Sequence, residues 1–515
     1  MPLQLLNQIN HPASDMRPAG ELFQDSLPNV DDVAEIAEKN NDFIAEELQA
    51  KARSLLVGAE ESLAALDGEI TRVQSLLNSL YFQRQLRVAR MDIYRSAIAP
   101  QRKLPTELWS QIFLWCTSEP VVIPPHLHEP PWTIGRVCSK WRRVALGTSF
   151  LWTDIFIRGN VFNGTGIDVD SVFNTLTEMV LARSGRYALS AVVEGEFGPS
   201  RNPLLLFIPH FPRIKVLSIL HSSSAVDLFL SMPPGSISSL ESLTIDHSDD
   251  NANFCSGSIF QDAPVLRRFE FLSYNMSRSW LSYLPLSQIT HLIIPYASTD
   301  PNGIVAILIR CPCLIECSFG VGTTAGLLPQ VEAGLYTIPS LQSFQVNLFD
   351  AVDITCLQRL ILPQIYKFEI LSAIPKGWDA GWMPTLTRSR RVEHLHLRDF
   401  IFSTTSLEEL MKAIPTLTVL DISSGNMISP SILDKMSSGQ LVPKLSALRC
   451  SINQSNHDGF KLHLDMLEKR RLGGKTVAHI ADVRFTTDSS DDRAWILSSE
   501  RLQQFQQDGW NIQVR

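Results

Sequence analysis

The sequence predicts an α/β repeat protein: a long, coiled-coil-like N-terminal helix, a small all-α module, and then an irregular solenoid of strand-and-return units. Three observations carry this prediction. Apolar residues alternate steps of three and four between residues 56 and 80, two amphipathic segments rich in tryptophan occupy residues 102–152, and an apolar template recurs from residue 212 to residue 485. At 515 residues, the chain is too long for one ordinary core, so several domains or an extended array are expected.

Two segments are expected before the module. Residues 1–30 combine scattered Pro, Asn and Asp with no periodicity, which predicts a disordered arm. Residues 31–98 contain no proline and are predicted to be a helical, coiled-coil segment. Its apolar seam consists of Leu56, Ala59, Leu63, Leu66, Ile70, Val73, Leu77 and Leu80, and it resumes at Met91, Tyr94 and Ile98. Because Arg84 and Arg87 interrupt the seam, two interpretations stay open: a homodimer through residues 56–94, or a helix or helical hairpin folded back on its own chain.

The stretch LPTELWSQIFLWC, which begins at Leu104, predicts the first helix of the module. Pro105 suits a first helical turn, and Glu107 suits the positive end of the helix dipole. Two apolar stripes follow, one made of Leu108, Ile112 and Trp115 and the other of Trp109, Phe113 and Cys116. A helix apolar over this much of its circumference needs cover on two sides, one of which we expect to be another protein.

The stretch WTIGRVCSKWRRVALGTSFLW predicts a second amphipathic helix with a basic back. Its apolar stripe at helical spacing consists of Ile134, Val137, Cys138, Trp141 and Ala145. Between residues 84 and 143, ten Lys and Arg outnumber four Asp and Glu, although the whole chain has a net charge of -8. A basic module in an acidic protein favours an acidic protein partner, because charge complementarity speeds association and selects partners.

These two segments resemble the F-box, the short helical module that holds the Skp-type adaptor of SCF ubiquitin ligases. The resemblance covers residues 102–152, and it implies binding to this adaptor and, through it, to a cullin. The adaptor-facing positions that it implies are Leu104, Pro105, Leu108, Ile112, Val137, Cys138 and Trp141. The stretch from Ser118 to Pro131 departs from the compact family pattern. The alternative interpretation is that these residues only build a small helical core.

The template P-x-L-x-x-L-x-L, or an apolar variant of it, recurs eleven times. Its first apolar positions are 214, 240, 266, 289, 314, 341, 365, 392, 417, 445 and 480. This spacing resembles leucine-rich repeats, whose units of about 20 to 29 residues each supply one strand and one return segment. It predicts an irregular leucine-rich-repeat solenoid over residues 153–515, with helices such as 304–310 and 406–413 between strands. The order of segments resembles the expanded F-box families of mushroom-forming (basidiomycete) fungi.

A target surface is expected where residues flank the second apolar position of each repeat. These side chains point away from the core, onto the concave strand surface that solenoids use for partners. The charged candidates for substrate binding are Arg268, Glu270, Lys367, Glu369, His394, His396 and Arg449. The set is chemically mixed, with neither a basic stripe nor an aromatic ladder, which disfavours nucleic acid as a partner.

Signals for chemistry are weak. The chain has no HExxH, no P-loop, no G-x-S-x-G and no paired CxxC, which favours a protein that is not an enzyme and binds no cofactor or metal. A glycine run at 320, 322 and 326 is expected to be a repeat turn, and the cysteines at 311, 313 and 317 are expected to pack rather than bind metal. His394 and His396 lack a third metal partner in sequence. Aspartates at 488, 491 and 492 are expected in an exposed loop.

The compartment follows from the cysteines and from apolar content. The eight cysteines show no disulfide framework, and no apolar stretch is long enough to cross a bilayer. We therefore expect a cytoplasmic or nuclear protein without a membrane partner. The expected function is a non-catalytic substrate-recognition subunit of an SCF-type E3 ubiquitin ligase, in which the repeats hold an unknown protein substrate. The alternative is a coiled-coil and leucine-rich-repeat scaffold without a ligase role.

Overall fold

The computed structural model describes residues 46–125, 128–159, 169–197, 202–246, 258–274, 279–322, 332, 334–350, 354–422, 428–452, 457–472, 477–487 and 490–515. The chain divides into two compact units, Met1–Leu104 and Pro105–Arg515. The arm predicted over residues 1–30 lies outside the described residues. The fold is mixed α/β, with a long N-terminal helix and one parallel sheet of 15 strands.

The first unit contains one continuous helix, α2 (Glu46–Ile98), followed by the 3-10 turn η1 (Pro100–Lys103). Glu46 and Glu47 lie in the first turn and Arg95 in the last, where each charge complements the helix dipole. At 53 residues, α2 is about 80 Å long. The predicted helix is confirmed within these bounds, and a hairpin turn inside them is wrong, because α2 continues unbroken through Arg84 and Arg87.

The second unit begins with short helices: α3 (Thr106–Cys116), α4 (Ile134–Val137), α5 (Ser139–Gly147) and the 3-10 turn η2 (Ser149–Trp152). A strand, β1 (Val121–Ile123), lies between α3 and α4 and pairs in parallel with β2 (Asp154–Arg158). The prediction that residues 102–152 are all-α is therefore wrong. The β-branched run Val121-Val122-Ile123 favours a strand, and the neighbouring sheet offers it an edge.

The sheet continues without a change of direction, because its spatial order from β1 to β17 follows the chain, and of the strands that the structure describes only β9 and β11 lie outside it. The remaining strands are β3 (Leu189–Glu194), β4 (Ile214–Leu220), β5 (Ser242–Asp246), β6 (Arg268–Phe271), β7 (His291–Thr299), β8 (Glu316–Val321), β10 (Ser343–Leu348), β12 (Lys367–Gly377), β13 (His394–Ile401), β14 (Val419–Ile422), β15 (Ala447–Ser451), β16 (Asp482–Thr486) and β17 (Asn511–Val514). Strands β9 (Tyr336–Thr337) and β11 (Leu360–Ile361) form a separate pair.

Helices and 3-10 turns carry the chain from one strand to the next. The helices are α6 (Val169–Arg183), α7 (Leu204–Phe207), α8 (Ser223–Leu230), α9 (Ser279–Tyr283), α10 (Pro301–Arg310), α11 (Met383–Arg388), α12 (Thr404–Ala413), α13 (Pro430–Ser437), α14 (His457–Leu472), α15 (Ser490–Leu497) and α16 (Glu500–Gln507). The helices predicted at 304–310 and 406–413 are confirmed as α10 and α12. Both begin earlier than predicted, because Asp300 and Ser403 cap them by accepting hydrogen bonds from backbone N–H groups.

The core lies between the sheet and these return segments. All three apolar positions of every predicted template copy are buried, from Ile214, Leu217 and Ile219 to Ile480, Val483 and Phe485. The second positions stand in direct register across the sheet, as in the run Phe344, Phe368, Leu395 and Leu420. The apolar template therefore correctly predicted the strand of each of its copies and the side chains that face the core.

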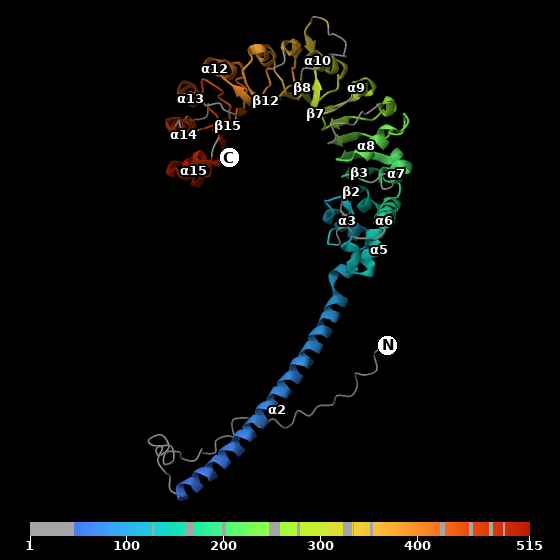
Figure 1. The fold of residues 1–515 in the computed structure, drawn as a ribbon, viewed down its shortest axis with the longest axis vertical. Coiled ribbons are helices and arrows are strands. Elements are labelled where there is room, and N and C mark those ends of the chain that lie inside the picture. The colour runs from blue at the N-terminus through green and yellow to red at the C-terminus, as the bar shows by residue number, and fades with distance from the viewer. Residues whose placement is uncertain are drawn as a thin grey trace. The chain divides into compact units, whose positions relative to one another are not determined.

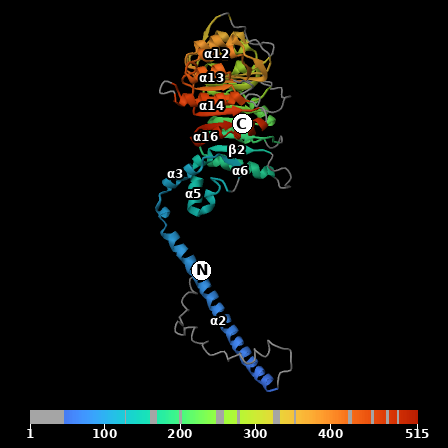
Figure 2. The same cartoon turned by 90° about the vertical axis from the view of Figure 1, so that its left-hand side faces the viewer.

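In the Pro105–Arg515 unit, the strands line the inner side of a curve and the helices lie along its outer side (Figure 1). Seen after a turn of 90°, the helices α12, α13, α14 and α16 are stacked layer on layer (Figure 2). The C-terminal segment adds the strand β17, which pairs with β16 through Val483 and Ile512. The strand residues that point away from the buried core therefore lie on the inner side of the curve, and we call this side the inner sheet surface.

Candidate functional site

Apart from Leu104, which ends the first unit, the predicted site residues lie on two surfaces of the second unit: the faces of α3, α4 and α5, and the inner surface of the sheet. The two apolar stripes of α3 have different fates. Trp109 and Phe113 are buried, and both contact Trp141 of α5, with ring centroids 4.7 and 5.2 Å away. This aromatic cluster buries Trp109 and Phe113, two members of the second predicted stripe. Cys116, the third member of that stripe, is exposed.

The other stripe stays open to solvent. Leu108 is 49% exposed, Trp115 is 82% exposed, and Val137 at the end of α4 is 58% exposed. Phe150 of η2 adds a further exposed aromatic ring. Among the described residues these four side chains therefore present bare apolar surface, of the kind that marks a protein-interaction site when it is contiguous.

The seven predicted adaptor-facing residues are all at least partly accessible. Pro105, Leu108, Val137 and Cys138 are exposed, Ile112 and Trp141 are half-buried, and Leu104, at the end of the first unit, is half-buried as well. Trp141 differs from the others because its ring packs against Trp109 and Phe113. Trp115 and Phe150 are not among the seven predicted residues, but their rings are more exposed than the side chains of several that are. Trp115 belongs to the same predicted apolar stripe as Leu108 and Ile112.

The single apolar stripe predicted from Ile134 to Ala145 is wrong. The backbone at Cys138 is extended, with φ -160° and ψ 169°, so α4 ends before it and α5 begins after it. The Cys138 Sγ accepts a hydrogen bond from the Trp141 backbone N at 3.4 Å and caps α5. This break sends Ile134 and Ala145 into the core and leaves Val137 on the surface.

The inner sheet surface is organised in two rows by the strand register. One row includes Ser242, Arg268, His291, Glu316, Ser343, Lys367, His394 and Val419, and the other includes Thr244, Glu270, Ile293, Ser318, Gln345, Glu369, His396, Asp421, Arg449 and Arg484. Each member stands beside the equivalent residue of the next strand. The predicted outward orientation of His394 and His396 is confirmed, because Leu395 and Leu397 between and beside them are buried.

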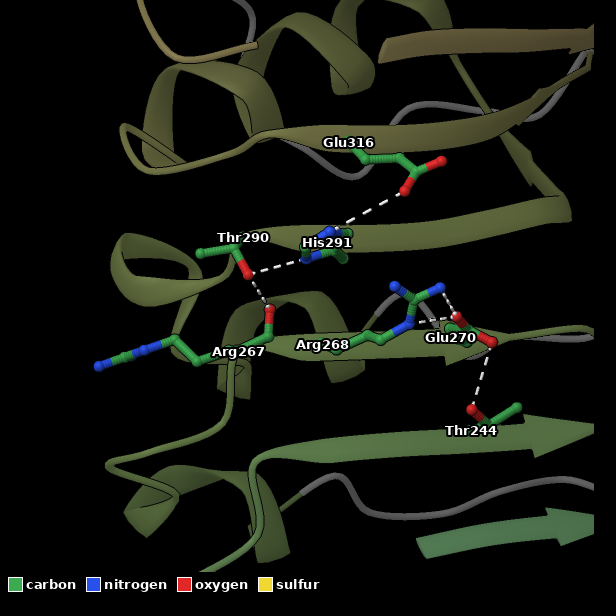
Figure 3. A network of polar contacts seen from close by, with 7 residues as sticks. All are labelled: Thr244, Arg267, Arg268, Glu270, Thr290, His291 and Glu316. Carbon is green, nitrogen blue, oxygen red and sulfur yellow. Dashed lines mark hydrogen bonds and ion pairs between the residues drawn. The ribbon is translucent and has the colours of Figure 1, made fainter. Parts of the chain in front are cut away.

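The first polar network lies on β5 to β8 (Figure 3). Arg268 Nε donates to Glu270 Oε1 at 2.6 Å, and Thr244 Oγ1 donates to the second Glu270 oxygen at 3.2 Å. His291 Nε2 lies 3.9 Å from Glu316 Oε2. Burial, and then the charge of Arg268, lower the pKa of His291, so protonation that would strengthen its pairing with Glu316 needs a pH below the usual histidine range.

The second network joins β12 to β15. Lys367 Nζ lies 3.1 Å from Glu369 Oε1, and His396 Nδ1 lies 3.7 Å from the same oxygen and 3.5 Å from Asp421 Oδ2. Arg449 Nη1 lies 3.3 Å from that Asp421 oxygen. Of the predicted substrate-binding residues, only His394 belongs to neither network. Its ring lies against Tyr366, and burial lowers its pKa.

The weaker signals have structural roles. Cys311 and Cys317 are buried, and burial raises the pKa of the Cys311 thiol to about 12, whereas Cys313 is exposed. The turn expected at Gly320 is wrong, because Gly320 lies inside β8, where a side chain would meet the Phe349 ring at 2.7 Å. Gly326 and Asp488 fall outside the described residues. The expected loop at Asp491 and Asp492 is wrong, because both open α15, where acidic residues are stabilised by the helix dipole.

Arg484 is a further inner-face residue that the sequence reasoning did not single out. It stands directly opposite Arg449 in the sheet. The signal was present, since Arg484 lies between Val483 and Phe485 in the last template copy. Across the described residues, no group of three His, Cys, Asp or Glu side chains could hold a metal ion. In that same part of the chain, no helix has the length and apolar content to cross a bilayer.

The chain matches no protein-family model and no curated protein sequence. Among solved structures, a crystal structure of a protein from Bacteroides fragilis is similar over 59% of this chain and 74% of its own. The sequence identity is 14% and the TM-score is 0.30.

Proposed function

We propose that this protein is a non-catalytic substrate-recognition subunit of an SCF-type E3 ubiquitin ligase. One observation carries the proposal: Leu108 and Trp115 of α3 and Val137 of α4 are exposed apolar side chains, although the rings of Trp109, Phe113 and Trp141 already pack on one another. The F-box-like sequence motif and the basic residues of the module support an acidic, Skp-type adaptor as the occupant of this surface, and a cullin would be reached through it. The protein would act in the cytoplasm, the nucleus or both.

The division of labour follows from the two surfaces. The module would anchor the adaptor, and an irregular leucine-rich-repeat solenoid would hold a target protein on its inner sheet surface. No catalytic group is required of this chain, because presenting a bound target to a ubiquitin-loaded enzyme accelerates transfer by proximity. The mixed charges of the inner surface favour a protein target over nucleic acid.

Capture of a purified Skp-type adaptor by the full chain tests the proposal. We expect the double variant Leu108→Ala and Val137→Ala to weaken binding by about a hundredfold, since two lost anchors of about 1.4 kcal/mol each give a tenfold loss apiece. Surface plasmon resonance measures the change. The matched control is Ile401→Ala, an exposed apolar residue of β13, which should bind like the natural chain. Equal affinity of the double variant and the control would sink the assignment.

A second candidate is a scaffold protein without a ligase role, which assembles through α2. The observation that favours it is the exposure of the α2 seam, in which Leu63, Leu77 and Leu80 are all solvent-accessible among the described residues. A coiled coil with a second copy of this chain would bury that seam.

A further inference from the structure

Two arginines stand directly opposite each other at the C-terminal end of the sheet. Arg449 of β15 and Arg484 of β16 are register partners, and adjacent strands are about 4.8 Å apart. Both side chains emerge on the inner surface, since the residues on either side of each in its strand are buried. Like charges directly opposite one another destabilise a sheet, so this pair needs a compensating anion.

Among the described residues, a carboxylate pairs with only one of the two arginines. Asp421 Oδ2 lies 3.3 Å from Arg449 Nη1, but His396 Nδ1 also lies 3.5 Å from that oxygen. Arg484 has neither an ion pair nor a hydrogen bond with any residue that the structure describes, and the Nε atoms of both arginines are buried without a partner in that part of the chain. A charged donor left unpaired in this way is costly, which leaves the pair poised for an external acceptor.

No neighbouring acid among the described residues forms an ion pair with Arg484. Asp482, the acid nearest to Arg484 on β16, has its Oδ1 hydrogen-bonded by the Asn511 amide at 2.8 Å. Two residues beyond the arginines, Ser451 and Thr486 are also register partners, with their hydroxyl oxygens 3.0 Å apart. Ser451 is buried, and Thr486 Oγ1 also lies 3.4 Å from the Cys450 carbonyl oxygen, so the strands stay polar beyond the arginines.

We propose that Arg449 and Arg484 form a binding site for a compact oxyanion, a phosphoryl or carboxylate group displayed by the protein that the inner surface holds. A guanidinium presents parallel N–H donors that match two oxygens of such a group, and two guanidiniums on adjacent strands can grip it from both sides. This inference deepens the proposed function, since it rests on the inner surface being the target site. Binding of a free anion, however, needs no adaptor.

Isothermal titration of the full chain with sodium phosphate, and separately with sodium acetate, at constant ionic strength tests the site. We expect saturable phosphate binding that weakens at least tenfold in Arg484→Gln. Arg398→Gln is the matched control, because Arg398 is an exposed arginine on the same surface of β13. Affinity in Arg484→Gln equal to that of the control, or no saturable binding of either anion to the natural chain, would overturn the proposal.

The two anions separate the sources of the ligand. Tighter phosphate binding assigns a phosphoryl group, and tighter acetate binding assigns a carboxylate. Thermal unfolding gives a second readout: phosphate should raise the Tm of the natural chain, and Arg484→Gln without anion should match or exceed the natural Tm, because it removes a like-charge contact. A lower anion-free Tm in Arg484→Gln than in Arg398→Gln, with no stabilisation of the natural chain by either anion, contradicts the site. If Arg484→Gln fails to fold, Arg484→Lys replaces it, and unchanged affinity there also overturns the proposal.

Failure of this inference and failure of the ligase proposal are distinguishable. The Leu108→Ala and Val137→Ala variant should keep its phosphate affinity, and Arg484→Gln should keep its adaptor affinity. Anion binding without adaptor capture retains the oxyanion site and removes the ligase role. Adaptor capture without anion binding retains the ligase role and removes the oxyanion site.

Discussion

At the scale of single residues, Arg470 of α14 is the most deeply buried charge among the described residues, with 1% of its surface exposed. No carboxylate in that part of the chain pairs with it. Its guanidinium instead donates to the backbone carbonyls of Met436, Val442, Pro443, Leu445 and Ala478. Burial lowers its pKa to about 10, so it stays protonated at neutral pH. Arg470 thereby ties α14 to the chain that connects α13 with β15.

We expect Arg470→Met to reduce the free energy of unfolding by about 3 kcal/mol, because it strips several buried carbonyls of their donor at once. Urea denaturation followed by circular dichroism measures the change. Arg471→Met is the matched control, since Arg471 is exposed and pairs with Asp508 at the surface, and it should cost under about 1 kcal/mol. If the two variants have the same free energy of unfolding, the hydrogen bonds of Arg470 do not stabilise the fold.

At the scale of elements, α2 presents a seam that the described part of its own unit leaves uncovered. Most helical stability in proteins comes from packing of an apolar face rather than from propensity, so an uncovered seam favours association with a partner. The seam is interrupted on the surface by Arg84 and Arg87, which would meet their own copies in a symmetric dimer. This arrangement favours association over residues 56–80 and weaker pairing beyond.

Light scattering of the full chain tests the association of α2. We expect a dimer that dissociates when Leu63→Asp and Leu77→Asp are combined, because charge at two seam positions cannot be buried without a partner. Ser75→Asp, an exposed position between seam residues, is the control and should leave the dimer intact. A natural chain that is monomeric at every concentration would remove the support for the scaffold candidate.

At the scale of the whole molecule, the repeated strands share one row of buried apolar residues. Phe368 of β12 contacts Phe344 on the preceding strand and Trp382 in the return segment, with ring centroids 5.6 and 5.5 Å away. In a solenoid each repeat contacts only its neighbours, so damage at one repeat is felt first by the next. The stability of the sheet is therefore local in origin.

We expect Phe368→Ala to cost about 3 to 5 kcal/mol, as for other buried aromatic residues that leave a cavity. Amide hydrogen exchange should show faster exchange in β10, β12 and β13 than in β4 and β16. The control Ile374→Ala, at an exposed position of the same strand, should change neither stability nor exchange. Uniform loss of protection across all strands would contradict the local behaviour of the repeats.

The sequence by itself determined where each repeat strand lies and which side chains face the core. The apolar template and the period-2 alternation are local, so the burial of Ile214, Phe269 or Val483 follows from the neighbours of each in the chain. Only the tertiary structure decided the break at Cys138, the recruitment of β1 into the sheet, and the meeting of Arg449 with Arg484. The recruitment of β1 and the meeting of the two arginines depend on cross-strand register and on a nearby sheet edge, which residues distant in sequence fix together. At Cys138 the conformation of the backbone, rather than the apolar spacing, ends one helix and begins the next.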